Sequence, residues 1–152
     1  MDLNKKLDAF IDQALQEDIG DGDHTSLACI PKEKRDTARL LVKDPGVIAG
    51  VEVAKRIFEK VDPSSKFEIF MEDGSDVHVG DIVYQVECNT QALLKAERLS
   101  LNIMQRMSGI ATYTHFLSNK ISKYKAKLLR SFINNNNFLN IFIVLKFIFG
   151  NS

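Results

Sequence analysis

Cysteine is scarce in this chain, and its scarcity argues against both a disulfide-stabilised fold and a cysteine-based zinc site. Cys29 and Cys88 are the only cysteines among 152 residues, and they do not form a Cys-x-x-Cys pair. Two thiols with this separation favour neither a disulfide framework nor a zinc site. We therefore expect both cysteines to be reduced and buried.

Long apolar runs are missing as well. Residues 1–6 lead into an amphipathic pattern and not into the apolar core of a signal peptide. The most apolar stretch, residues 138–149, has 12 residues and is interrupted by Asn140 and Lys146. A transmembrane helix needs about 20 apolar residues, so this stretch is too short to be a membrane anchor. We expect a cytoplasmic protein with no membrane partner.

Acidic residues are absent from the last third of the chain. Residues 1–97 hold all 20 acids and 12 Lys and Arg residues, a net charge of −8, whereas residues 98–152 carry a net charge of +8. The second part should favour anions or the acidic first part, unless these charges are solvated and even out in the fold. No nucleic-acid partner is expected. The length and the hydrophobic content of 45% suit one globular core.

The hydrophobic pattern predicts an α+β domain with short antiparallel strands. Helical spacing marks residues 3–17, residues 51–61 and a longer stretch that Asn89 or Thr90 can cap. Period-two alternation and turn residues mark the strands, which we place at residues 37–42, 47–50, 66–70, 77–79 and 82–86. Because Pro45-Gly46 reads as a turn, the first two of these strands are expected to form a hairpin.

Two groups of polar residues are candidates for chemistry, but each has a simpler explanation. Asp21, Asp23 and His24 resemble metal ligands, yet the segment lacks the later ligands of an EF-hand and a second histidine. Bonds from these side chains to the loop's own amides are the favoured interpretation. His78 lies on the polar side of its strand with no nucleophile beside it, which favours a surface position.

Residues 97–112 form the apolar helical stretch around which the chain is organised, and it carries two arginines. Arg98 and Arg106 are eight residues apart, which places them about 80° apart on a helix of 3.6 residues per turn. They need not share a partner. Each is either a solvated surface arginine or a planar fork for a carboxylate or phosphate. Spacing alone favours the surface position.

The residues around this helix resemble the quinolinate phosphoribosyltransferase family. The resemblance is carried by Ala96-Glu97-Arg98, Leu101-Asn102, Gln105-Arg106 and Ser108-Gly109-Ile110-Ala111-Thr112. Earlier segments agree in order and spacing: residues 17–25, Gly46-Val47-Ile48-Ala49-Gly50, and Asp73-Gly74 through Gly80-Asp81. The resemblance covers roughly residues 3–129, and several ordered motifs together make it specific.

This resemblance implies an N-terminal α/β sandwich with a long helical segment, followed by a C-terminal α/β barrel that holds most of the active site. Family members transfer a phosphoribosyl group from phosphoribosyl pyrophosphate to quinolinate in NAD biosynthesis, with Mg²⁺ as cofactor. They release carbon dioxide and pyrophosphate and leave nicotinate mononucleotide. They are homodimers in which the N-terminal domain of one subunit closes the barrel of the other. The resemblance implies that Arg98 binds quinolinate across that interface, and it implies no such role for Arg106.

A carrier domain is the alternative from another class. Residues 73–83 are similar to the hairpins of biotinyl and lipoyl carriers. Those carriers present a modifiable lysine at a tight turn, but here no lysine lies between Lys66 and Lys95. The chemistry of a carrier is therefore missing.

After residue 129 the chain departs from the family, which continues into an Asp-Thr-Arg-Lys-Thr strand. Residues 130–152 instead contain five of the ten phenylalanines and six of the ten asparagines. We predict a family-like domain over residues 1–112, a linking helix over residues 113–129 and an aberrant, aggregation-prone tail over residues 130–152. A frameshift, a mis-spliced gene model or a truncated gene would explain the tail. The barrel is then missing, which predicts a non-catalytic fragment, and a related enzyme for another base stays open.

Overall fold

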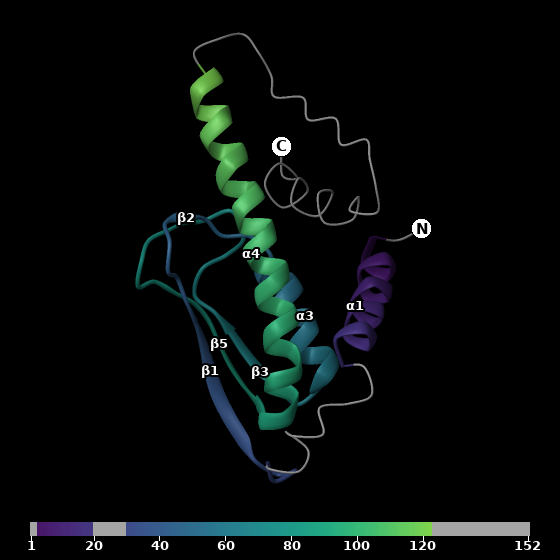
Figure 1. Ribbon diagram of the computed structural model, residues 1–152. Helices are drawn as coiled ribbons and strands as arrows, with labels where there is room; N and C mark the ends of the chain where they lie inside the picture. The colour runs from purple at the N-terminus through teal and green to yellow at the C-terminus, as the bar shows by residue number, and fades with distance from the viewer. Residues whose placement is uncertain (1–2, 20–29, 123–152) are drawn as a thin grey trace.

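The computed structural model describes residues 3–19 and 30–122, which form three helices and five strands (Figure 1). The helices are α1 (Leu3–Ile19), α3 (Val51–Val61) and α4 (Thr90–Ile121), and the strands are β1 (Arg35–Leu41), β2 (Gly46–Val47), β3 (Lys66–Ile69), β4 (Asp76–Val77) and β5 (Ile82–Asn89). The predicted α+β class is confirmed, as are the helices expected at residues 3–17 and 51–61. Within the described ranges, no helix is both long and apolar enough to cross a membrane.

The strands form two antiparallel sheets, one ordered β1-β5-β3 and one of β2 and β4. In the larger sheet, Ala38 of β1 and Phe67 of β3 both lie opposite Val86 of the central strand. The central strand β5 buries Val83, Tyr84, Val86 and Cys88. The predicted buried position of Cys88 is confirmed, and burial raises the pKa of its thiol to about 11. Cys29 lies outside the described residues.

The hairpin expected between residues 37–42 and 47–50 is wrong. β1 pairs with β5, and β2 pairs with β4, so both strands find partners in the segment of residues 76–89. The pairing continues just past β1, where the backbone N–H of Val42 donates to the carbonyl of Asp81 at 2.9 Å. The Pro45-Gly46 turn therefore carries the chain from one sheet to the other and does not fold it back on itself.

Helix α4 runs along the length of the described domain and packs against α3, β2 and the larger sheet (Figure 1). It buries an apolar face that includes Ala96, Ile103, Met104, Met107 and Ala111. Its 32 residues continue without a break through the boundary expected at residue 112. The division at residue 112 stays a prediction, and residues 123–152 lie outside the described part of the chain.

The first turn of α4 is capped as predicted. The side chain of Asn89 accepts hydrogen bonds from the backbone N–H groups of Gln91 and Ala92, at 3.0 and 3.2 Å. The backbone N–H of Asn89 donates to the carboxylate of Asp62 at 2.9 Å. Hydrogen bonds from Ser64 and then from Asn89 hold the pKa of Asp62 below its ordinary value. One carboxylate thus ties the end of α3 to the start of α4.

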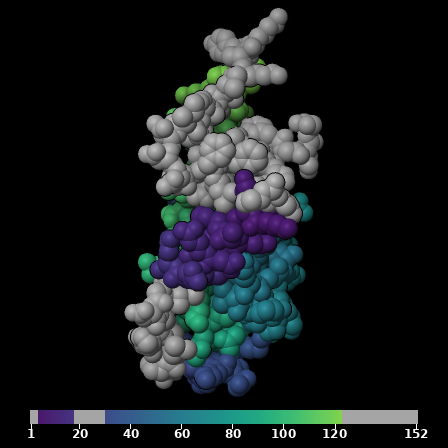
Figure 2. Space-filling model, turned by 90° about the vertical axis from the view of Figure 1, so that its right-hand side faces the viewer, coloured from purple at the N-terminus to yellow at the C-terminus, as the bar shows by residue number. Residues whose placement is uncertain are grey.

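Helix α1 covers one side of α3 and also contacts α4 (Figure 2). Leu7, Ile11 and Leu15 recur along one helix face and are buried in the core. At the surface Lys60 of α3 forms an ion pair with Asp12 at 2.7 Å. Because exposed ion pairs contribute little, burial of the apolar face supplies most of the docking free energy.

Helix α3 begins without a capping side chain of its own. Gly50 occupies the N-cap position with a φ of 98°, a left-handed conformation that favours glycine. Asp73, from the loop before β4, accepts hydrogen bonds from the backbone N–H groups of Val51 and Glu52, at 2.8 and 3.3 Å. The cap of α3 therefore comes from a residue more than 20 positions later in the chain.

Replacing this distant cap should weaken the whole domain. We expect Asp73→Ala to lower the free energy of unfolding by about 1–2 kcal/mol, because two backbone donors lose their acceptor.

Burial raises the pKa of Asp73, so ionisation of this carboxyl opposes folding. The free energy of unfolding of wild type should therefore fall relative to that of Asp73→Asn as the pH rises from the unfolded pKa of about 3.8 through the higher pKa of Asp73 in the folded chain. Urea unfolding of the three chains across this pH range checks both effects, and parallel pH curves for wild type and Asp73→Asn would contradict the second.

Candidate functional site

The side chain that the sequence singled out, Arg98, lies on the exposed side of α4. Gln105 follows it by seven residues, or 700° of helix rotation, only 20° short of two full turns. Arg98 therefore lies on the same face of α4 as Gln105. Arg106 is also exposed but lies 80° away around the helix. Both arginines are thus exposed on α4, and they point in directions about 80° apart.

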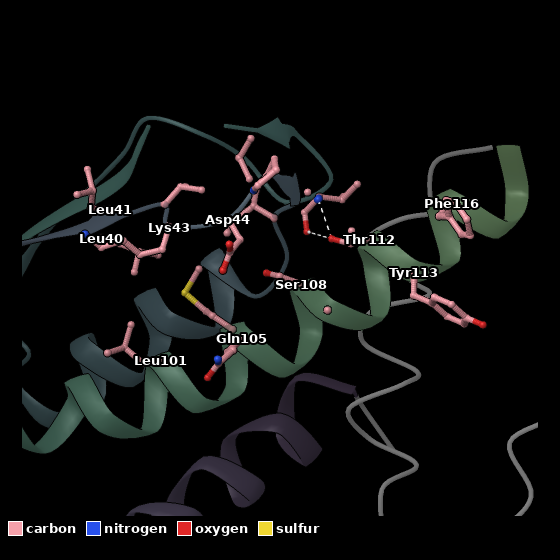
Figure 3. A pocket seen from close by; sticks show the side chains of 18 residues that line it. Leu40, Leu41, Lys43, Asp44, Leu101, Gln105, Ser108, Thr112, Tyr113 and Phe116 are labelled. Atoms are coloured by element: carbon pink, nitrogen blue, oxygen red, sulfur yellow. Dashed lines mark hydrogen bonds between the residues drawn. The ribbon is translucent and has the colours of Figure 1, made fainter. Parts of the chain in front are cut away.

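The face of α4 that includes Gln105 forms one wall of a groove (Figure 3). The opposite wall is the segment from the end of β1 through β2, and the volume between them is about 740 Å³. The residues named in Figure 3 show both walls: Leu40, Leu41, Lys43 and Asp44 on one side, and Leu101, Gln105, Ser108, Thr112, Tyr113 and Phe116 on the other. The groove begins at Leu101, one helical turn after Arg98.

Two hydroxyl groups of α4 hold the two walls together. Ser108 Oγ accepts from the backbone N–H of Ala49 at 2.9 Å and donates to its carbonyl at 3.2 Å. One turn later, Thr112 Oγ1 accepts from the N–H of Val47 at 2.9 Å and donates to its carbonyl at 3.5 Å (Figure 3). β2 pairs with β4 along one edge only. The two hydroxyls satisfy backbone groups that a further strand would otherwise pair.

This arrangement explains why two separate sequence motifs belong together. The segments Gly46–Gly50 and Ser108–Thr112 carry the family resemblance, and the structure places them in direct contact. A Cβ atom at Gly46 would lie only 2.5 Å from Thr112 Oγ1. Glycine is therefore required at this position for close approach of the backbone to the helix.

Large apolar side chains are exposed along the groove. The exposed fractions are 43% for Leu41, 38% for Leu101, 55% for Tyr113 and 52% for Phe116. Sequence reasoning missed this groove. A signal for it was present in the sequence: Leu101, Tyr113 and Phe116 are large apolar residues on the otherwise polar side of α4. These side chains place exposed apolar surface on both walls of the groove.

The remaining candidates contribute no further site. His78 is at the surface as predicted, with 80% of its side chain exposed and Asp81 at 3.9 Å. Asp21, Asp23 and His24 lie outside the described residues. Across residues 3–19 and 30–122 there is no group of three or more His, Cys, Asp or Glu side chains arranged to bind a metal ion. A ligand set for the implied magnesium ion is therefore not found in this part of the chain.

Comparison with known proteins agrees with the fold and the motifs. Residues 23–108 match the model of the quinolinate phosphoribosyl transferase N-terminal domain. A rice protein named nicotinate-nucleotide pyrophosphorylase [carboxylating], chloroplastic, is 48% identical over 109 residues, which are 71% of this chain and 29% of the relative. A tobacco protein named quinolinate phosphoribosyltransferase [decarboxylating] 1b is 46% identical over 109 residues, 71% of this chain and 31% of the relative.

Solved structures agree as well. The crystal structure of NadC from Streptococcus pyogenes superposes with a TM-score of 0.87 at 26% identity, covering 94% of this chain and 51% of that one. The fold and the paired motifs define the α+β N-terminal domain of a phosphoribosyltransferase. The chain belongs to the quinolinate phosphoribosyltransferase family, as the resemblance predicted. It spans about a third of the length of the curated relatives and about half of the solved chain.

A double-mutant cycle tests the contact between Gly46 and Thr112. Gly46→Ala should lower the free energy of unfolding by about 1–3 kcal/mol, because the new methyl group collides with Thr112 Oγ1. Thr112→Ala alone should also destabilise the chain, since the N–H of Val47 loses its acceptor. In the double variant the collision is gone. The decrease in its free energy of unfolding should therefore be smaller than the sum of the decreases in the two single variants. Additive losses in urea unfolding would mean that the contact does not set the requirement for glycine.

Proposed function

We propose that this chain supplies the N-terminal, quinolinate-contacting part of a quinolinate phosphoribosyltransferase. The reaction transfers a phosphoribosyl group from phosphoribosyl pyrophosphate to quinolinate and yields nicotinate mononucleotide, carbon dioxide and pyrophosphate. The observation that carries the proposal is Arg98, an exposed guanidinium within the matched family segment. Its position on the face of α4 that also lines the groove separates it from Arg106.

Arg98 suits a dicarboxylate substrate in its chemistry. A guanidinium donates two parallel N–H bonds to one carboxylate, and quinolinate has two carboxylates. The residue lies about two turns into α4, whose start is fixed by the Asn89 cap and the Asp62 carboxylate. A rigid helix therefore presents the fork, which binds and orients the substrate and forms no covalent bond with it.

The other parts of the reaction are assigned to groups outside the described residues. Magnesium, when bound, neutralises the pyrophosphate leaving group, but the described residues provide no ligand set for it.

We propose a homodimer in which Arg98 reaches the barrel of a partner subunit. The cytoplasmic location stays a prediction, since the rice and Arabidopsis relatives are named as chloroplastic proteins.

The second candidate function is that of a non-catalytic fragment. The 152 residues span 29% of the rice relative and contribute one candidate substrate arginine. We therefore propose that this polypeptide alone does not complete an active site and at most docks on an intact barrel. A related phosphoribosyltransferase that uses another base is the remaining alternative. Comparing turnover of quinolinate with turnover of other bases distinguishes the two enzymes.

The 152-residue polypeptide should form no nicotinate mononucleotide by itself. Purified chain is incubated with quinolinate, phosphoribosyl pyrophosphate and magnesium, and the product is measured by liquid chromatography. A bacterial enzyme of the family serves as the positive control. Turnover that is present in wild type and lost in Arg98→Ala would overturn the fragment interpretation.

The role of Arg98 is tested in a chimera that joins residues 23–108 of this chain to the remainder of the rice relative. Arg98→Ala should raise KM for quinolinate about 10-fold to 100-fold, the range expected for lost hydrogen bonds to a charged group. KM for phosphoribosyl pyrophosphate should not change. The KM for quinolinate of Arg98→Lys should lie between those of the parent and of Arg98→Ala, because lysine keeps the positive charge but lacks the planar fork of the guanidinium.

Arg106→Ala is the matched control in the same chimera, since this arginine is exposed on another face of the same helix. We expect its KM for quinolinate to equal that of the parent. Equal effects of the two alanine variants, or an equal rise in both Michaelis constants for Arg98→Ala, would remove the assignment of Arg98 to quinolinate.

A further inference from the structure

We infer that Gly109 is a point of close contact between α4 and a partner subunit, at which no side chain fits between the two. The inference rests on the homodimer proposed above, in which Arg98 reaches the barrel of the partner, and it extends that contact along the helix. It follows from what the fold of this chain requires at residue 109 and from the face of α4 on which that residue lies.

Glycine at residue 109 weakens the helix that contains it. Gly109 lies in the interior of α4, which extends from Thr90 to Ile121 without a break. After proline, glycine is the residue that least favours a helix interior, because its backbone loses the most conformational freedom on folding. Alanine would therefore give the more stable helix, unless another requirement excludes a side chain.

The described chain contains no such requirement. Gly109 is not among the described glycines with positive φ, so no left-handed conformation favours glycine there. A Cβ atom built on Gly109 would meet no described atom within 4 Å. Gly46, on the opposite wall of the groove, is the contrast, because its Cβ would lie 2.5 Å from Thr112 Oγ1. The described chain thus leaves room for a methyl group at residue 109 and does not itself require glycine there.

Gly109 lies on the face of α4 that carries Arg98. The two residues are 11 positions apart, or 1100° of rotation, only 20° beyond three full turns, and about 16 Å apart along the helix axis. Gly109 also lines the groove, with Gln105 one turn before it and Tyr113 one turn after it (Figure 3). A body that receives the guanidinium of Arg98 and continues along this face therefore lies over Gly109.

The size and chemistry of this face identify its partner as protein surface. From Arg98 to Phe116 the face extends about 27 Å at 1.5 Å per residue, much longer than a pyridine dicarboxylate. Quinolinate therefore accounts for the cationic end only. Tyr113 and Phe116 expose 55% and 52% of their surface, and aromatic side chains are enriched in the cores of protein interfaces. In the proposed homodimer the subunit that receives Arg98 also covers Gly109.

Glycine on this face allows the partner to approach α4 more closely than a side chain would permit. Gln105 and Tyr113 are each one turn away, so they stand on either side of the bare backbone at Gly109. A protruding group of the partner subunit enters the space between them, as a knob enters a hole between packed helices. A methyl group at residue 109 would occupy that space and separate the two surfaces.

The first measurement is made on the 152-residue chain alone. Gly109→Ala should raise the midpoint of thermal unfolding by about 2–5 °C, because alanine favours the helix and its methyl group meets open space. Circular dichroism at low protein concentration follows the transition.

The second measurement uses a chimera that joins residues 23–122 of this chain to the remainder of the rice relative. Here Gly109→Ala should weaken the dimer. Dimers labelled with a donor or an acceptor fluorophore are mixed, and energy transfer reports the rate at which subunits exchange. This rate should rise about tenfold to a hundredfold, the range expected when a methyl group is forced into a packed contact.

Two further variants of the chimera serve as controls. Gly109→Leu should leave the chimera monomeric, because a larger side chain separates the surfaces further. Glu59→Ala, at an exposed position of α3, should exchange subunits at the parent rate.

A more stable chain together with faster subunit exchange supports the inference. A thermal midpoint that does not rise overturns it, because the fold itself then requires glycine. Unchanged exchange, a monomeric parent chimera, or activity lost without faster exchange also overturns it. The KM for quinolinate separates the two proposals. If Arg98→Ala raises this KM in the same chimera while Gly109→Ala leaves exchange unchanged, only the contact at Gly109 fails. If Arg98→Ala leaves this KM unchanged while Gly109→Ala speeds exchange, only the role of Arg98 fails.

Discussion

The fold depends on the contact of two hydroxyl groups with one short backbone segment. Ser108 bonds the N–H and the carbonyl of Ala49, two residues after β2, and Thr112 bonds those of Val47 within β2. Without them a two-residue strand would have one partner and an open edge. With them β2 is fixed against α4, and the groove has a second wall. The absence of a side chain at Gly46 permits this approach.

The same contact determines what α4 presents to its surroundings. One side of the helix is held by the core and by β2, which leaves the stripe that runs from Arg98 to Phe116. That stripe carries a cation at its beginning and apolar side chains beyond it. A helix surface with this order suits a partner that offers an anionic group next to apolar surface. Quinolinate held near a barrel rim is a partner of this kind under the proposed function.

The parts of the structure that sequence reasoning predicted are those set by local interactions. The α1 pattern, the Asn89 cap and the surface position of His78 depend on residues close in sequence. The pairing of β1 with β5 depends on residues about 50 positions apart, whereas the Pro45-Gly46 turn locally predicts a hairpin that does not form. The groove requires knowing which side of α4 faces β2, and periodicity alone does not provide this. Motif resemblance linked the two segments that meet there but not their contact.

The late partners of β1 and β2 have a consequence for the order in which the chain can fold. β1 ends at Leu41, but its partner β5 is complete only at Asn89, and the hydroxyl that holds Val47 belongs to residue 112. A growing polypeptide must therefore expose both strands, unpaired, until residues 76–89 have left the ribosome. Contacts between distant residues slow folding, and unpaired strands invite association with other chains. This domain is thus most vulnerable during its synthesis.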